Sequence, residues 1–148
     1  MPSLKDRLFD PDSMGTRGRP GYTLRQIIDS VRDDLEDLLN TRRSFSVPET
    51  KYAEVARSIV NYGVPDLISL GAATPSKQEE VAHIIEEIIT LHEPRLRNVR
   101  ARLVRARALE LRVLFHVDAE LRVDPCPAVA FETVVELTTG HASIRERT

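Results

Sequence analysis

The sequence lacks tryptophan, has few other aromatic residues and contains a single cysteine, Cys126. One cysteine excludes an internal disulfide, so packing alone must stabilise the fold. Because aromatic rings are scarce, we predict a core built from Leu, Ile, Val and Ala. At 148 residues the chain has the size of one domain and can bury such a core without a metal ion. Cys126 lies between two prolines without a basic neighbour, which indicates an unreactive loop thiol in a reducing compartment.

Long hydrophobic runs are also missing. No stretch approaches the roughly 18 consecutive apolar residues of a membrane-spanning helix, so we predict no membrane insertion. The first twenty residues lack the apolar segment of a secretory signal peptide. The net charge of −2 combines many acids with many bases, and it provides no overall attraction to nucleic acid or anionic lipid. We therefore expect a cytoplasmic protein.

Motifs that hold cofactors are absent from the sequence. The glycine patterns that bind phosphates or dinucleotides do not occur. No histidine has a second His or Cys at the spacing of metal ligands. The histidines are His83, His92, His116 and His141. We predict that the protein binds no metal and no cofactor.

The chain divides into an arm and a domain. Residues 1–21 are rich in Pro, Gly, Asp, Ser and Arg, which predicts a flexible arm that orders only on a partner. Residues 22–148 are predicted to form a single domain. Within it, Thr23 is a suitable N-cap, and apolar residues follow at spacings of three and four. This pattern predicts a helix that ends near Asn40.

Two further helices are expected. Ser76 and Glu79 match a capping box, and an apolar face from Val81 onwards predicts a second long helix that Pro94 ends. A shorter helix is expected over residues 52–61. Its predicted inward-facing side chains, with the residue that follows, are Val55, Ile59 and Tyr62.

From residue 98 onwards the apolar period changes to two, which is typical of strands with one buried face. Three strands are predicted, with a short fourth at residues 141–145. The expected inward-facing residues are Val99, Ala101, Leu103, Leu109, Leu111, Val113, Phe115, Val117, Val129, Phe131, Thr133, Val135 and Leu137. Helices followed by strands predict an α+β fold with two layers, in which helices pack on one face of a small, mainly antiparallel sheet. If the last strand is an edge, its free N–H and C=O groups can pair with another chain.

A run of arginines accompanies the first predicted strand. Its members are Arg95, Arg97, Arg100, Arg102, Arg105 and Arg107. Proteins that bind nucleic acid use such runs on phosphates, but this run lacks the interleaved aromatic residues that stack on bases. Since Arg100 and Arg102 share one strand face, a solvated or partner-facing sheet surface is the simpler interpretation. We expect no nucleic acid partner.

Carboxylates suggest one enzymatic alternative. Glu93 stands at a helix end, with Glu86 and Glu87 two turns earlier. Glycosidases need two carboxyl groups that face each other across a cleft. The helix has ordinary solvent-facing positions to fill, so we interpret Glu86 and Glu87 as members of its solvated face.

Three short passages carry a family resemblance. They are DLEDLLNTRR at 34–43, SIVNYGVPDL at 58–67 and HEPRL at 92–96. Their order and separation resemble the TssE family, which are baseplate subunits of bacterial type VI secretion systems. That family is related to a baseplate wedge protein of contractile-tailed phages. The resemblance extends from about Thr23 to Arg145, and LLNTRR together with NYGVPDL is quite specific.

The resemblance implies a structural role. Members help assemble the baseplate wedge with TssF, TssG and TssK, and they help start the contractile sheath of TssB and TssC. The phage relative was once labelled a lysozyme, so a cell-wall hydrolase with Glu93 as its acid is the alternative. No second carboxylate lies close to Glu93 in its motif, and we therefore expect no enzyme.

Five residues are candidates for partner binding: Glu93, Pro94, Arg95, Arg42 and Arg43. Pro94 stiffens the backbone between Glu93 and Arg95, so two opposite charges are held on a rigid corner. Either they pair with each other as a clamp, or they reach outward to a partner. Arg42 and Arg43 follow the first helix, where a cation can satisfy free carbonyl groups. We expect them to be mainly structural, with docking as the alternative.

Overall fold

A computed structural model describes most of the chain beyond its first 22 residues. The described residues are 23–43, 53–56, 58–67, 69–71, 74–107, 112–136, 139 and 141–147. The predicted arm at residues 1–21 lies outside these ranges. No helix in the described ranges is both long enough and apolar enough to cross a membrane.

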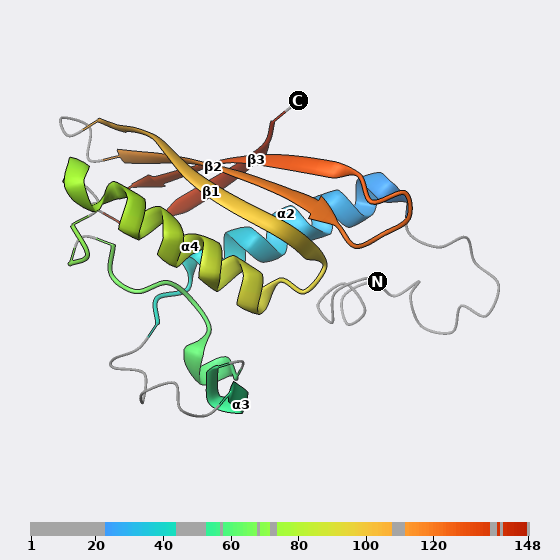
Figure 1. Cartoon of the computed structure of the whole chain (residues 1–148), viewed down its shortest axis with the longest axis horizontal. Coiled ribbons are helices and arrows are strands. Elements are labelled where there is room, and N and C mark those ends of the chain that lie inside the picture. The colour runs from blue at the N-terminus through green and yellow to red at the C-terminus, as the bar shows by residue number, and fades with distance from the viewer. Residues whose placement is uncertain are drawn as a thin grey trace.

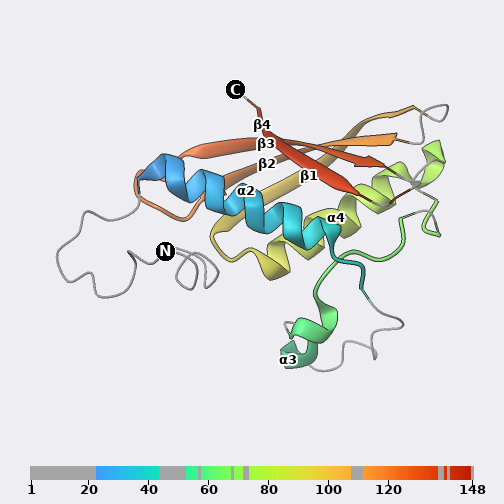
Figure 2. The same ribbon diagram turned by 180° about the vertical axis from the view of Figure 1, so that it is seen from behind.

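Two long helices cover one face of a four-stranded antiparallel sheet (Figure 1). The elements are α2 (Leu24–Asn40), α3 (Ala53–Ala56), η2 (Ile59–Asn61), η3 (Pro75–Lys77), α4 (Gln78–His92), β1 (Leu96–Arg107), β2 (Arg112–Leu121), β3 (Ala128–Glu136) and β4 (Ala142–Glu146). The strands lie in sequence order, with β1 and β4 at the edges. Helix α4 packs under β1 and α2 packs under β4, as the reverse view shows (Figure 2). The predicted α+β class with helices on one face is confirmed.

Helix α2 begins and ends where the sequence predicts. The Thr23 hydroxyl accepts a hydrogen bond from the Gln26 N–H, and the Gln26 side chain accepts one from the Thr23 N–H. This reciprocal pair is a capping box, which satisfies N–H groups that the first turn leaves free. At the other end the Thr41 N–H and hydroxyl both donate to the carbonyl of Asp37.

The capping box predicted at Ser76 and Glu79 is wrong. Ser76 lies inside the 3-10 turn η3, and the N-cap of α4 is Lys77, which makes no side-chain capping bond. An N-cap needs an extended backbone, whereas Lys77 has a helical one, with φ −103° and ψ −6°. The turn therefore leads directly into the helix. The predicted end is correct, because α4 stops at His92, two residues before Pro94.

The short helix predicted over residues 52–61 is also wrong in part. Helix α3 covers four residues, and the extended backbone of Ser58 separates it from η2. This break turns Ile59 outward, where it is 88% exposed, although it was predicted to face inward. Asn61 occupies the buried position instead, at 5% exposure.

The sheet follows the predicted alternation. Val113, Phe115 and Val117 on β2 are buried against the helices, as are their counterparts on β3. Leu109, Leu111 and Leu137 lie outside the described residues. Strand β1 departs from regular pairing between Arg97 and Arg100, where Asn98 has a positive φ of 53°. The core is therefore aliphatic, with two phenylalanines at its centre.

Candidate docking site

The first two sequence motifs bind each other through their backbones. The Arg43 N–H donates to the Val64 carbonyl at 2.9 Å, and the Val64 N–H donates to the Thr41 carbonyl at 2.8 Å. Gly63 makes this approach possible. Its φ is +102°, and a Cβ there would lie 2.4 Å from the Thr41 oxygen. Only glycine adopts this backbone without strain and leaves that space.

Asn61 joins the second motif to the other two. Its side-chain oxygen accepts from Arg43 Nη1 at 2.7 Å, and its carbonyl oxygen bonds His92 Nε2 at 3.1 Å. A carbonyl only accepts, so the neutral imidazole carries its proton on Nε2. The Tyr62 ring meets the His92 ring edge-on, with centroids 5.3 Å apart.

The His92 imidazole is held in its neutral form. Burial lowers the pKa of His92, and the nearby Arg43 charge lowers it further. The bond to the Asn61 carbonyl opposes both effects only in part. The end of α4 therefore contacts the second motif through an uncharged ring.

Arg95 connects the third motif to helix α2. Its Nε donates to Glu93 Oε1 at 2.8 Å and its Nη2 to Glu93 Oε2 at 2.5 Å. The same Nη2 donates to Asp34 Oδ2 at 2.5 Å, and Nη1 donates to the Ser30 hydroxyl at 3.0 Å. Glu93 is only 4% exposed, so the network is largely internal.

The charges of this network stabilise one another. Burial alone would lower the pKa of Arg95, but the hydrogen bonds and charges of Glu93 and Asp34 raise it overall. The guanidinium is therefore a permanent cation between two carboxylates. Glu93 and Arg95 pair with each other, which is one of the two arrangements that the sequence left open. A bidentate geometry of this kind fixes both the distance and the angle of the corner.

At the surface of this corner lies Pro94. It is exposed and lines a hollow of about 780 Å³. The other lining residues are Glu86, Glu87, Thr90, Leu91 and Arg122. Behind the hollow, the Arg122 N–H donates to the Arg95 carbonyl at 2.8 Å. The hollow thus rests on a backbone that the buried network holds in place.

The prediction that Glu86 is an ordinary solvated residue is wrong. Its side chain is 18% exposed and accepts from Arg100 Nη1 at 2.9 Å. It also accepts from the Ala101 N–H at 3.1 Å, so it covers one free group on the outer edge of β1. Glu87, at 68% exposure, matches the predicted solvated position.

Arg42 and Arg43 lie beside the end of α2, but their described side-chain bonds are not to its carbonyls. Thr41 fulfils that role, because its extended backbone turns the two arginines away from the helix axis. Arg42 is exposed and its Nη2 donates to the Thr139 carbonyl at 3.0 Å. The Arg43 side chain instead donates to Asn61. The predicted helix-capping role is therefore wrong.

Sequence reasoning missed several residues of the site. Asp34 and Ser30 were not predicted to contact Arg95, although Asp34 belongs to the first motif. Asn40 was also missed. Its side-chain amide donates to the Ala142 carbonyl at 2.9 Å and accepts from the Ala142 N–H at 2.7 Å. For Asp34 and Asn40 the available signal was that both are polar residues inside the first motif, whereas Ser30 lies outside it.

Comparison with protein families agrees with this arrangement. The model of the family "Baseplate wedge protein gp25" matches residues 25–126, a range that contains all three motifs. The chain belongs to the baseplate wedge protein gp25 family. No curated protein matches the chain. The resemblance to a TssE-like wedge family is thus confirmed, and family membership indicates a structural role in a baseplate.

The interlocked motifs give this wedge family member a defined corner. Arg95, just before β1, binds the middle of α2, and Asn61 of the second motif joins Arg43, just after α2, to His92 at the end of α4. Among the described residues, no three His, Cys, Asp or Glu side chains are grouped to hold a metal ion.

Proposed function

We propose that this chain is the TssE-type wedge subunit of a type VI secretion baseplate. In this proposal it assembles with TssF, TssG and TssK in the cytoplasm, within a baseplate docked to the membrane, and residues 22–148 act as one unit. The single observation that supports it best is the convergence of the three motifs on one braced corner. At this corner, residues that are far apart in the sequence contact one another and fix the position of Pro94.

The corner is well suited to docking because it is rigid before a partner arrives. Binding loses less entropy when the contacting backbone is already fixed. In this proposal Pro94 and the hollow beside it contact the partner, while Glu93 and Arg95 position them from behind. Arg42 contributes at the surface, since its one described hydrogen bond leaves further guanidinium donors for a partner. Arg43 acts through Asn61.

Co-purification with TssF and TssG tests this interface. Thr90 is exposed and lines the hollow, so Thr90→Arg should block it without disturbing the buried network. Thr74→Arg is the matched control, because Thr74 is exposed and does not line that hollow. We expect Thr90→Arg to melt like the wild type but to lose TssF and TssG, and Thr74→Arg to retain both. Unchanged binding by Thr90→Arg would remove the hollow from the interface, and a wild type that binds neither protein would refute the partners.

Arginine chemistry provides a second test of the same corner. Arg95→Ala removes the whole network, and Arg95→Lys replaces a planar fork with a single ammonium group. Both variants should weaken binding. Since Arg95 is mainly internal, both should also lower thermal stability. Binding by both variants at wild-type strength would show that the corner does not position the partner surface.

We further propose that β4 starts the TssB and TssC sheath by strand addition. His141 and Arg147 exchange backbone bonds with β3, so the alternation of an antiparallel pair turns the N–H and C=O groups of Ile144 and Glu146 outward. The N–H and C=O groups of Ala142 are already bonded to the Asn40 side chain. A new strand therefore has a short edge at Ile144 and Glu146.

A proline at the edge tests strand addition. Glu146→Pro removes an outward N–H, and proline is tolerated on edge strands. Glu146→Ala is the control, because both variants lose the ion pair with Arg25. We expect Glu146→Pro to prevent sheath assembly and Glu146→Ala to allow it. Normal sheaths with Glu146→Pro would exclude pairing at this edge.

We also propose that the protein is not a hydrolase. A general acid must reach its substrate, but Glu93 is 4% exposed and both of its oxygens accept bonds from Arg95. Both carboxylate oxygens of Glu93 thus face a guanidinium and not an open cleft. Release of soluble sugar from peptidoglycan, lost in a folded Glu93→Gln variant, would instead establish the hydrolase alternative.

A further inference from the structure

The second face of the sheet is left uncovered by helices. Both long helices lie on one side, and the other side, here called the open face, carries alternate side chains of all four strands. Its described members are Arg97, Arg100, Arg102, Val104, Arg112, Leu114, His116, Asp118, Glu120, Ala128, Ala130, Glu132, Val134, Glu136, Ser143, Arg145 and Arg147. The docking corner and the β4 edge make no use of most of this surface.

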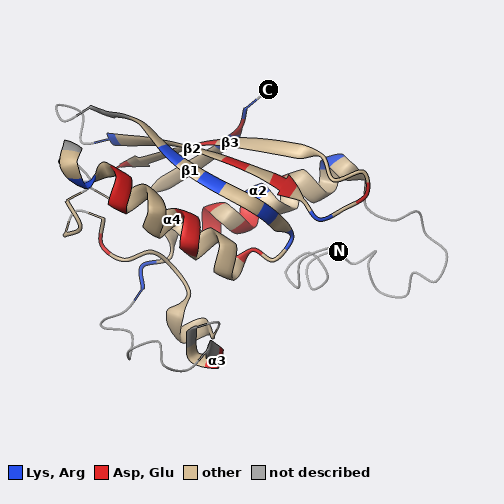
Figure 3. Cartoon of the chain, viewed as in Figure 1, with Lys and Arg blue, Asp and Glu red and all other residues tan. Residues whose placement is uncertain are grey.

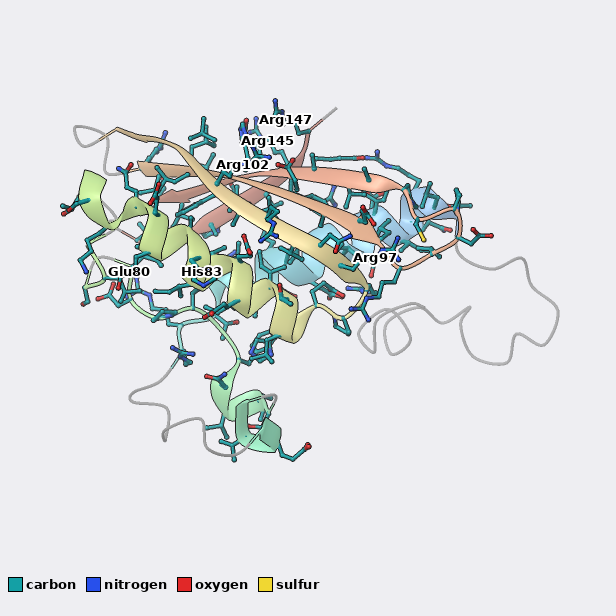
Figure 4. All side chains as sticks on the ribbon, viewed as in Figure 1. Glu80, His83, Arg97, Arg102, Arg145 and Arg147 are labelled. Atoms are coloured by element: carbon teal, nitrogen blue, oxygen red, sulfur yellow. The ribbon has the colours of Figure 1, made fainter. Side chains whose placement is uncertain are left out.

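Charges on the open face are ordered across the strands. One row runs from Arg102 on β1 through His116 and Glu132 to Arg145 on β4. Figure 3 shows basic segments on β1 and at the C-terminal end of the chain, with acidic segments on β2. Figure 4 shows Arg102, Arg145 and Arg147 above the sheet, on the side away from α2 and α4. Arginines therefore border the face, and carboxylates lie between them.

The carboxylates at the centre are already engaged. Asp118 accepts from Arg102 at 3.0 Å, and Glu132 lies 3.5 Å from His116. Arg145 has no side-chain partner among the described residues. Arg102 is 74% exposed despite its bond. Arg102 and Arg145, at the edges of the face, thus retain guanidinium donors for a partner.

Apolar side chains form a neighbouring row on the same face. Leu114 and Val134 are cross-strand partners and are half-buried, and Ala130 follows on β3. Val104 lies at the irregular pairing of β1 beside them and is 48% exposed. Protein interfaces are enriched in arginine, and here exposed arginines lie on the same face as this apolar row.

We propose that the open face binds an amphipathic helix of a partner protein, with its apolar side on Leu114 and Val134 and carboxylates along its flanks. Three strand spacings of about 4.8 Å place the edge arginines about 14 Å apart, and a helix is about 10–12 Å wide. One helix therefore fits between Arg102 and Arg145, where its acids meet both. A helix there also completes a three-layer arrangement that buries both faces of the sheet.

A nucleic acid fits the same face poorly. Phosphates would have to lie over Asp118 and Glu132, which occupy the middle of the sheet. The described face also presents no aromatic ring other than His116 on which a base could stack. The open face is therefore better matched to a helix that has an apolar stripe and carries its carboxylates along both flanks.

This inference rests on the proposed role in an assembly, but it involves a different surface from the corner. The test places a photo-crosslinking amino acid at Leu114 in cells that carry the full set of baseplate genes, followed by identification of the linked peptide. We expect a crosslink to an amphipathic helix rich in Asp and Glu. The double variant Arg102→Glu with Arg145→Glu should lower its yield by about tenfold or more, because like charges oppose each other. Arg25→Glu with Lys77→Glu, exposed on the helical layer, is the matched control and should retain it.

Several results would overturn the inference. They are the absence of a crosslink, a crosslink to an extended or basic segment, and a yield that the charge-reversed variant leaves unchanged. Binding of fluorescein-labelled duplex DNA at physiological salt, lost in that same variant, would assign the face to nucleic acid instead. Failure of TssF and TssG to co-purify bears only on the proposed function, since the crosslink reports whichever protein occupies the face.

Discussion

Removing Arg95 is the strongest perturbation of stability that the corner allows. Arg95→Ala removes the two charged bonds of the Glu93 carboxylate, which is 4% exposed in the wild type, and it also removes one bond each from Asp34 and Ser30. Breaking a buried ion pair by removing one partner costs about 3–5 kcal/mol. The side chains of Arg95 and Asp34 are 16% and 25% exposed, so solvent screens part of the effect. We therefore expect a loss of about 3 kcal/mol in the free energy of unfolding.

Thermal melting and urea unfolding measure this loss. For a chain of this size, about 3 kcal/mol corresponds to a fall in Tm of roughly 6–12 °C. Asp34→Ala should be milder, at about 1 kcal/mol, because this carboxylate is the more exposed of the two. The double variant Arg95→Met with Glu93→Leu is the control, since replacing both charges by apolar groups is often close to neutral.

The ordering of these three variants tests the reasoning. The account requires Arg95→Ala to be the least stable, with Asp34→Ala and the double variant nearer the wild type. A loss below about 1 kcal/mol for Arg95→Ala would contradict it, because a buried carboxylate left unpaired must cost more than that. A double variant as unstable as Arg95→Ala would show that packing, rather than charge, decides the effect.

Three further predictions concern stability. Gly63→Ala should destabilise the protein by about 2 kcal/mol or more in urea unfolding, because a Cβ at φ +102° collides with the Thr41 oxygen. Unchanged stability would contradict that close approach. Thr133→Val should be neutral or should stabilise by up to about 1 kcal/mol in urea, since the buried Thr133 hydroxyl has no described partner, whereas a loss above about 1 kcal/mol would reveal one. The pKa of His92 is lowered in the folded protein, so the unfolded chain takes up a proton first as the pH falls below about 6.5. Stability should therefore decline below that pH, and above it this group should have no effect. His92→Gln should flatten this decline in melting curves taken across the range, and an equal decline in His92→Gln would assign it to other groups.

Local sequence patterns correctly predicted the helices and strands that are specified by the spacing of their own apolar residues. Helix α2 follows from the Thr23 cap and the spacing of its apolar residues, and β2 follows from the alternation around Phe115. Such patterns mislead where the same residues are compatible with two local backbone conformations. Ser76 has the composition of an N-cap, but a 3-10 turn already surrounds it. Ile59 was predicted to face inward because a continuous helix was assumed, and the break at Ser58 rotates it outward.

The candidate site was predicted only in part, because its contacts join distant segments. The sequence indicated that Glu93 and Arg95 share a rigid corner, yet it gave no indication that Asp34, 61 residues earlier, meets the same guanidinium. That contact depends on the angle at which α2 crosses beneath the sheet, which no local pattern encodes. The role of Gly63 also depends on a distant segment, because a side chain there would collide with Thr41.

The affinity of the purified chain for a purified TssF–TssG complex tests the central claim most directly, with Thr90→Arg measured beside the wild type. We expect the wild type to bind with a measurable Kd, for example by titration calorimetry. We also expect Thr90→Arg to weaken binding by about thirtyfold or more while its melting curve is unchanged, as for a blocked interface centre. Equal affinities for the two proteins, or no binding by a folded wild type, would contradict the claim that this corner holds the subunit in a baseplate.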